Sequence, residues 1–279
     1  IVAVYTNNIK INNATNIKLV SSLEQLVEEC DAVYIASSPC LHYQQIEYCL
    51  NNSKHVLCET PISLNVRENK NLIELAHKNK CILMDSLKTA YSTAYNRLLV
   101  MVKSGKIGDI ISIDATCTSL TNLQDESWNS MYYWGPTALL PIFNLLGTDY
   151  INKNITVKLK ENTPIFSKID FMYENAVASL KVGNGVKSEG ELIISGTKGY
   201  IYVPAPWWKT DYFEIRYENP YTNKRYFYQL DGEGIRYELV AFVRMIQTNK
   251  NLSYVDENIS NAISKVMQDF DAREKLNYI

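Results

Sequence analysis

Short apolar runs alternate with amphipathic segments along the first 90 residues. Four runs are apolar and rich in β-branched residues, which is typical of buried strands, at residues 1–6, 31–36, 55–59 and 81–85. Between them, amphipathic segments predict one helix capped by Ser22, another over 41–50, and a third over about 66–79 capped by Ser63. Strands separated by such helices are typical of a doubly wound parallel sheet.

The pattern changes near residue 90, where strand-like runs joined by short turns become dominant. These runs lie at 110–118, 155–160, 168–173, 176–183, 190–195, 199–203, 211–217 and 225–230, and helices are predicted at about 94–104, 135–147, 234–247 and 256–275. Connectors with Gly, Pro or Asn are typical of hairpins, so this half is predicted to be α+β with a large, mostly antiparallel sheet. We therefore expect an α/β domain over residues 1–91 and an α+β domain over residues 92–279.

Composition and charge exclude several classes of protein. The 279 residues are 46% hydrophobic and 21% charged with a net charge of −2, which is ordinary for a globular protein. The charges are interspersed, so no nucleic-acid partner is expected. No apolar run approaches 18 residues, so no membrane partner is expected either. The first residues resemble no signal peptide, which favours the cytoplasm, and the lack of an initial Met suggests numbering that starts inside a longer chain.

Cysteine and glycine positions restrict the chemistry further. All six cysteines lie in the first half without a C-x-x-C pair, and there are three histidines, so we expect reduced thiols and no metal site. The first of the 11 glycines is Gly105. Residues 1–104 therefore contain neither a G-x-G-x-x-G fingerprint nor a P-loop.

Five segments carry a resemblance to a known family. They are D-A-V-Y-I-A-S-S-P-C-L-H (31–42), K-H-V-L-C-E-T-P (54–61), S-G-K-I-G-D-I (104–110), G-P-T-A-L-L-P-I-F-N-L-L-G (135–147) and S-G-T-K-G-Y-I (195–201). In this order and spacing they resemble the glucose–fructose oxidoreductase, inositol dehydrogenase and MocA (Gfo/Idh/MocA) family. The resemblance implies an NAD- or NADP-dependent oxidoreductase that acts on a sugar, polyol or related small molecule.

The same resemblance implies an architecture for both halves. The N-terminal half would be a Rossmann domain and the C-terminal half a large sheet, through which members of the family often form homo-oligomers. Members begin with a strand, a glycine fingerprint and a helix, and Ile1 corresponds to their second strand. In the strand order 3-2-1-4-5-6 the missing strand is central, and a sheet without it would leave two edges unpaired. We therefore expect this strand to lie upstream of Ile1.

The usual acid–base residues of the family are replaced in this chain. The resemblance aligns the family's Lys, Asp and His with Thr60, Tyr133 and Thr137. Threonine does not titrate near neutral pH, and an ordinary tyrosine has a pKa of about 10. Lys88 follows the strand at 81–85, at the edge of the sheet where α/β proteins bind ligands, and is the candidate for proton transfer. A solvated loop lysine is the alternative.

Other positions match the cofactor-binding segments of the family. The resemblance implies contact with the adenosine ribose from Thr6 and Asn7, with the phosphates and nicotinamide ribose from Ser37, Ser38 and His42, and with the cofactor from the segment Glu59, Thr60 and Pro61. A hydrogen-bonded histidine at the start of a helix, with a structural role, is the alternative for His42.

Two questions stay open at the level of sequence. The segment 204–209, P-A-P-W-W-K, could serve a ligand site, a subunit interface or the core. The whole chain could be an active dehydrogenase, a catalytically silent protein that binds a nucleotide or a sugar, or a domain of a larger multifunctional chain.

Overall fold

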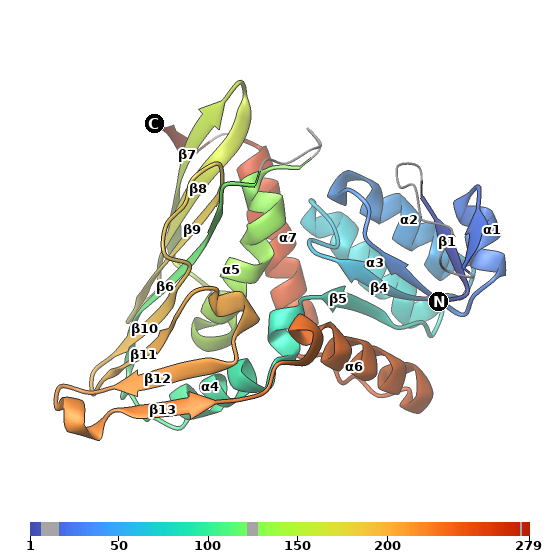
Figure 1. Ribbon diagram of the computed structural model, residues 1–279. Helices are drawn as coiled ribbons and strands as arrows, with labels where there is room; N and C mark the ends of the chain where they lie inside the picture. The colour runs from blue at the N-terminus through green and yellow to red at the C-terminus, as the bar shows by residue number, and fades with distance from the viewer. Residues whose placement is uncertain (7–16, 122–127, 274) are drawn as a thin grey trace.

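A small parallel sheet with flanking helices packs beside a large mixed sheet in the computed structural model (Figure 1), which describes residues 1–6, 17–121, 128–273 and 275–279. The first half contains β1 (Ala3–Tyr5), β2 (Lys18–Val20), α1 (Leu23–Glu28), β3 (Ala32–Ile35), α2 (Pro39–Asn51), β4 (His55–Glu59), α3 (Val66–Lys78) and β5 (Leu83–Ser86). Every strand pair here is parallel, as predicted.

The parallel strands form two separate sheets in the part of the chain that the structure describes. β1 pairs with β2, and β3, β4 and β5 form a three-stranded sheet in that order. In a sheet of order 3-2-1-4-5-6 this division falls at the position of strand 1, between strands 2 and 4. The position of the expected first strand thus coincides with the division between the two sheets.

One helix cap in this half differs from the sequence predictions. The Ser22 side chain caps α1 as predicted, but the cap of α3 is Asn65, whose side chain accepts hydrogen bonds from the backbone of Arg67 and Glu68. Ser63 instead accepts a hydrogen bond from the Asn65 backbone. The prediction that Ser63 caps this helix is therefore wrong, because Asn65 stands directly before the first helical residue.

The second half contains a nine-stranded sheet. Its elements are η1 (Lys88–Tyr91), α4 (Thr93–Lys103), β6 (Ile110–Ser119), α5 (Ser130–Leu146), β7 (Asn152–Lys160), β8 (Thr163–Met172), β9 (Val177–Asn184), β10 (Leu192–Gly196), β11 (Tyr200–Val203), η2 (Trp207–Lys209), β12 (Tyr212–Arg216), η3 (Pro220–Thr222), β13 (Lys224–Phe227), η4 (Asp231–Gly234), α6 (Ile235–Thr248), α7 (Glu257–Asp271) and β14 (Leu276–Tyr278). The order is β13-β12-β11-β10-β6-β9-β8-β7-β14. Neighbours are antiparallel except β6 with β9 and β7 with β14, so the α+β prediction is confirmed.

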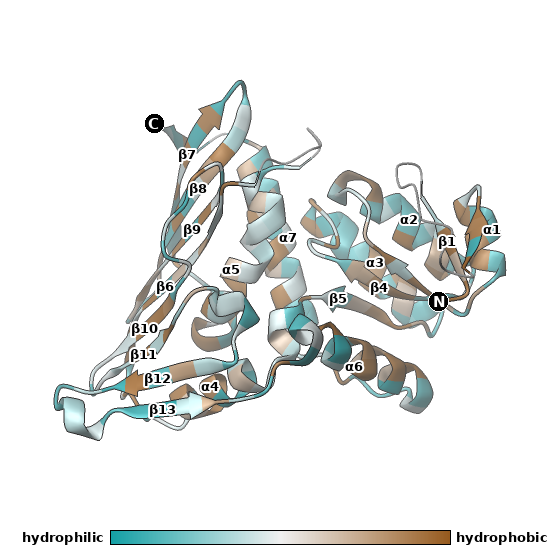
Figure 2. Cartoon of the chain, viewed as in Figure 1, coloured by the Kyte–Doolittle hydropathy of each residue, from teal (hydrophilic) through white to brown (hydrophobic). Residues whose placement is uncertain are grey.

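Helices α5 and α7 lie along one face of this sheet (Figure 1). Hydrophobic and hydrophilic segments alternate along its strands (Figure 2), as expected when one face is covered. Helix α5 starts at Ser130, five residues before the predicted start, because the Asn129 side chain accepts hydrogen bonds from Met131 and Tyr132. No helix in the described part of the chain is long and apolar enough to cross a membrane.

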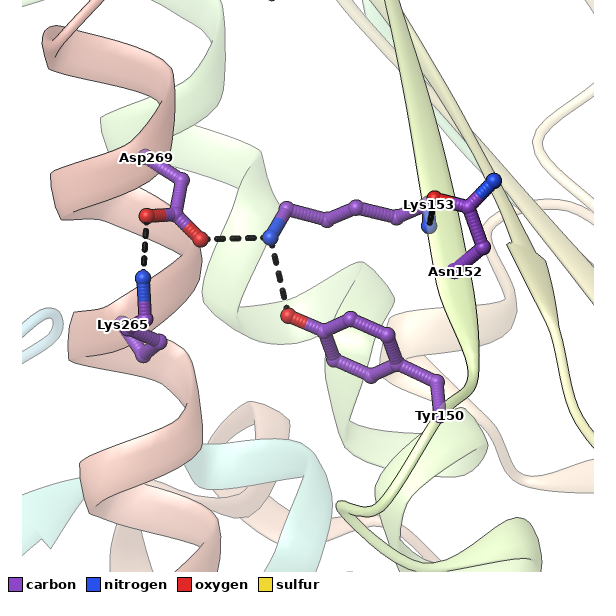
Figure 3. Close-up of polar contacts among 5 residues, drawn as sticks. All are labelled: Tyr150, Asn152, Lys153, Lys265 and Asp269. Carbon is purple, nitrogen blue, oxygen red and sulfur yellow. Dashed lines mark hydrogen bonds and ion pairs between the residues drawn. The ribbon is translucent and has the colours of Figure 1, made fainter.

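Helix α7 is held on both sides. Lys153 of β7 pairs with Asp269 of α7 at 2.5 Å and also contacts the Tyr150 hydroxyl at 2.9 Å (Figure 3). On the other side, Asn69 of α3 donates a hydrogen bond to Ser260 at 3.2 Å. Helix α7 therefore joins the two halves of the chain, and the division at residues 91 and 92 stays a prediction.

Candidate active site

A cavity of about 900 Å³ lies where the carboxyl ends of β4 and β5 face helix α5. Its lining includes Thr60, Lys88, Tyr133 and Thr137, which are the four candidates for catalysis, together with Glu59. These residues come from three separate segments of the chain. The fold therefore brings the predicted catalytic residues together, although their roles stay predictions.

Local structure explains how each side chain reaches the cavity. Glu59 and Thr60 stand at the end of β4, and Lys88 begins the 3-10 turn that follows β5. Tyr133 and Thr137 are four residues apart on α5 and share one face of that helix. Lys88 is half-buried, and among the described residues no carboxylate lies within ion-pair distance of its ammonium group. The ammonium group is therefore available to a ligand.

His42 connects two loops beside this cavity. Its side chain is fully buried, with Nδ1 at 2.8 Å from the Pro61 carbonyl and Nε2 at 3.0 Å from the Ser37 carbonyl. Burial lowers the pKa of His42, and the two carbonyl contacts oppose that change. Both ring nitrogens therefore contact the backbone, which fits the structural alternative. Contact with a cofactor stays a prediction.

Two of the remaining cofactor candidates, Ser37 and Ser38, lie beside the cavity lining. Ser37 donates a hydrogen bond to Gln45 at 2.5 Å, and Ser38 is the N-cap of α2. Both belong to the turn after β3, next to Ala36, which lines the cavity. Thr6 follows β1 in the separate two-stranded sheet, and Asn7 lies outside the described residues.

Aromatic side chains form one wall of the cavity. Trp208 and Trp134 lie 4.8 Å apart between ring centroids, and Tyr133 lies 4.8 Å from Trp134. The neighbouring Trp207 is fully buried and donates a hydrogen bond to the Thr116 carbonyl at 3.1 Å. Of the three environments that the sequence left open for segment 204–209, Trp207 therefore lies in the core and Trp208 lies at the candidate site.

One residue that sequence reasoning missed lies just behind the cavity. Glu238 of α6 is buried and accepts a hydrogen bond from Ser86 at 2.8 Å. Burial, assisted by the nearby Glu59 and Asp85 carboxylates, raises the pKa of Glu238 to about 8. A sequence signal was available, because Glu238 shares helical spacing with the buried Phe242 and Met245.

Comparisons with known proteins agree with the fold and the resemblance. Residues 1–86 match the model of the Gfo/Idh/MocA oxidoreductase family, NAD-binding Rossmann fold. The scyllo-inositol 2-dehydrogenase (NADP(+)) IolU of Bacillus subtilis is 40% identical over 76 residues, which are 27% of this chain and 23% of that protein. The dTDP-3,4-didehydro-2,6-dideoxy-alpha-D-glucose 3-reductase of Streptomyces violaceoruber is 31% identical over 90 residues, 32% of this chain and 26% of that protein. The alignments thus cover about a quarter of each relative.

Solved structures extend the likeness to the whole chain. KijD10, a 3-ketoreductase from Actinomadura kijaniata solved with TDP-benzene and NADP, superposes with a TM-score of 0.84 and 15% identity over 100% of this chain and 90% of that one. The UDP-N-acetylglucosamine 3-dehydrogenase GnnA from Acidithiobacillus ferrooxidans gives a TM-score of 0.76 at 16% identity, over 91% of this chain and 81% of that one. At 15–16% identity the solved structures show a shared fold alone, whereas the family model shows a sequence relationship over residues 1–86. Residues 1–86 therefore match the NAD-binding Rossmann fold of the Gfo/Idh/MocA oxidoreductase family, and the solved structures show the fold of the whole chain.

Proposed function

We propose that this protein is an NAD- or NADP-dependent oxidoreductase that acts on a sugar, polyol or related small molecule in the cavity between β4, β5 and α5. The observation that carries the proposal is the meeting of Lys88, Thr60 and Thr137 in one cavity at the carboxyl edge of a parallel sheet. Ligands of open α/β folds bind at that edge. The named relatives act on inositol or nucleotide-linked sugars, which supports the same class of substrate.

The residues present fit the nicotinamide end of a dinucleotide. Ala36, Glu59 and Thr60 line the cavity at the ends of β3 and β4, where they would hold the nicotinamide and its ribose. Ser37 and Ser38 at the start of α2 would face the phosphates. Residues 1–104 contain no glycine, so they supply no glycine-rich phosphate loop. The fit is therefore limited to this end of the cofactor.

Proton transfer would be the task of Lys88. When bound, the cofactor exchanges a hydride with the carbinol carbon of the substrate. In oxidation, the Lys88 Nζ amine takes the proton of the substrate hydroxyl, and in reduction the ammonium returns a proton to the carbonyl oxygen. Thr60 and Thr137 can hydrogen-bond the same oxygen but do not titrate near neutral pH. Lys88 is thus the candidate that meets both the position and the chemistry.

The rest of the cavity favours a ring with polar or anionic substituents. Trp208 and Trp134 offer apolar faces on which a sugar ring can stack. Three lysines line the cavity, Lys88, Lys187 and Lys209, and Lys209 pairs with Glu233 of the same lining at 2.6 Å. Lys88 and Lys187 are therefore the cations that can face an anionic group of the bound molecule. A phosphorylated or nucleotide-linked sugar satisfies both features.

The test uses the full-length protein. Fluorescence titration with NADH and NADPH measures cofactor binding, and a panel of sugars, inositols and nucleotide-linked sugars is then screened for nicotinamide absorbance changes. We expect saturable cofactor binding and turnover of at least one compound in the panel. Cofactor binding without turnover, unchanged by Thr60→Lys, would favour a catalytically silent binding protein instead.

A further inference from the structure

The Glu238 carboxyl group is unusual because half of its hydrogen-bonding capacity is unused. The side chain is 2% exposed, and its Oε1 accepts a hydrogen bond from the Ser86 hydroxyl at 2.8 Å. Its Oε2 is buried and has no hydrogen-bond partner among the described residues. A buried carboxylate oxygen without a partner is strongly unfavourable, so such a group calls for a functional explanation.

The start of α6 packs against the segment that carries Lys88. Gly234, directly before α6, packs so closely on Lys88 that an added Cβ would lie 2.8 Å from the Lys88 carbonyl oxygen. One helical turn later, Glu238 contacts Ser86, which stands two residues before Lys88 and lines the same cavity. The start of α6 thus contacts the segment from Ser86 to Lys88 at both ends.

Titratable groups surround Glu238 from several elements. Glu59 of β4, Asp85 of β5 and Lys88 of η1 act on it through their charges, while Glu238 in turn acts on Tyr34 of β3 and Tyr91 of η1. Burial is the largest influence and raises the pKa of Glu238. The hydrogen bond from Ser86 and the charge of Lys88 lower it, so the net effect is a pKa of about 8. Glu238 therefore changes charge near physiological pH.

Building on the proposed function, we propose that Glu238 is a positioning residue for Lys88: it fixes the end of β5 through Ser86, and its own protonation sets the charge that faces the Lys88 ammonium group. Protonated Glu238 is neutral and holds Ser86 in place. When Glu238 loses its proton to water, its carboxylate stabilises the ammonium form of Lys88 nearby. The ammonium form is the one that can give a proton to a ketone, so Glu238 would keep the enzyme active in reduction at alkaline pH.

The first experiment is the pH profile of kcat/KM for reduction in the full-length protein and in Glu238→Gln. Glutamine keeps the size and an acceptor for Ser86 but cannot ionise. We expect the alkaline limb to move to lower pH by about one unit, because Glu238→Gln removes a negative charge that acts on Lys88. The matched control is Glu191→Gln, because Glu191 also has a buried oxygen without a partner and a threonine hydroxyl at 3.4 Å but does not line the cavity.

The second experiment does not depend on turnover. Lysines are reductively methylated with a ¹³C label, and the Lys88 resonance is assigned by its loss in Lys88→Arg. We expect its chemical shift to show an inflection near pH 8 that Glu238→Gln removes and Glu191→Gln retains.

The outcomes separate this inference from the proposed function. If Glu238→Gln lowers kcat/KM equally at every pH and the Lys88 resonance still shows the inflection, Glu238 has a structural role alone and the inference is overturned. If no compound is turned over but the inflection depends on Glu238, the coupling of Glu238 to Lys88 is supported and the oxidoreductase proposal fails.

Discussion

Gly234→Ala tests whether contact with α6 holds Lys88 in place. Gly234 has φ of +93°, a conformation that L-residues rarely adopt, and an added Cβ would lie 2.8 Å from the oxygen and 3.4 Å from the carbonyl carbon of Lys88. The backbone conformation alone costs about 1–3 kcal/mol for alanine. The carbonyl contact is far inside van der Waals distance and is made by backbone, so Lys88 must move. We expect a total destabilisation of about 2–4 kcal/mol.

Gly232→Ala in the same turn is the matched control. Gly232 also has positive φ, at +57°, but the nearest atom to its added Cβ is the Cβ of Arg236 at 4.0 Å. Its replacement should therefore cost about 1–2 kcal/mol of conformational energy without displacing Lys88. The difference between the two variants measures the contact with Lys88.

Urea unfolding and steady-state kinetics give the two readouts. Since a displacement of about 1 Å of a catalytic group can cost about 10²-fold in rate, kcat of Gly234→Ala should fall by about 10-fold or more. Gly232→Ala should keep kcat close to that of the wild type. Equal losses of stability and of kcat in the two variants would refute the view that this contact positions Lys88.

Three further predictions concern the rest of the molecule. Trp207→Ala should lower the free energy of unfolding by about 3–5 kcal/mol, whereas Trp208→Ala should mainly raise KM for the substrate. Urea denaturation and steady-state kinetics of both variants separate the two effects. A rise in KM for Trp207→Ala but not for Trp208→Ala would contradict these assignments. Burial raises the pKa of Asp269, but the Lys153 and Lys265 ammonium groups outweigh it, so the net pKa is lowered. A carboxyl group whose pKa is lowered in the folded state contributes stability above the unfolded pKa of about 3.9, and this stability is lost as the pH falls. Asp269→Asn should therefore lower the free energy of unfolding by about 1–3 kcal/mol at pH 7 and by much less at pH 3. A loss that does not depend on pH would contradict the ion pairs of Asp269 with the two lysines. Finally, the nine-stranded sheet has a face without a helix in the described residues, and light scattering of the full-length protein should find a homo-oligomer that buries more than about 1,000 Å² there; a monomer at every concentration would count against it.

Much of the fold could be predicted because the periods of its elements are clear. The strands at 55–59 and 110–118 were found nearly to the residue, since β4 and β6 combine apolar runs with clear ends. The strands β2 and β14 were missed, because each has three residues and depends on a neighbouring strand rather than on its own pattern. Short strands of this kind are specified by tertiary pairing.

The candidate site was predictable where the family resemblance supplied positions, and not elsewhere. Lys88 and Thr60 could be placed at the carboxyl edge because each follows a predicted strand. Glu238 comes from a helix about 150 residues later, and no local pattern shows that this helix reaches β5. The different environments of Trp207 and Trp208 likewise depend on how one turn packs against β6, which sequence spacing does not reveal.

The role of Lys88 is the central claim, and the most direct test measures kcat and cofactor Kd for Lys88→Ala in the full-length protein. Because general acid–base catalysis is typically worth about 10²–10⁴ in rate, kcat should fall by that factor. The Kd for the nicotinamide cofactor should stay within about twofold, since proton transfer to the substrate is not part of cofactor binding. Full activity in Lys88→Ala would contradict the account, because another group in this cavity would then have to transfer the proton.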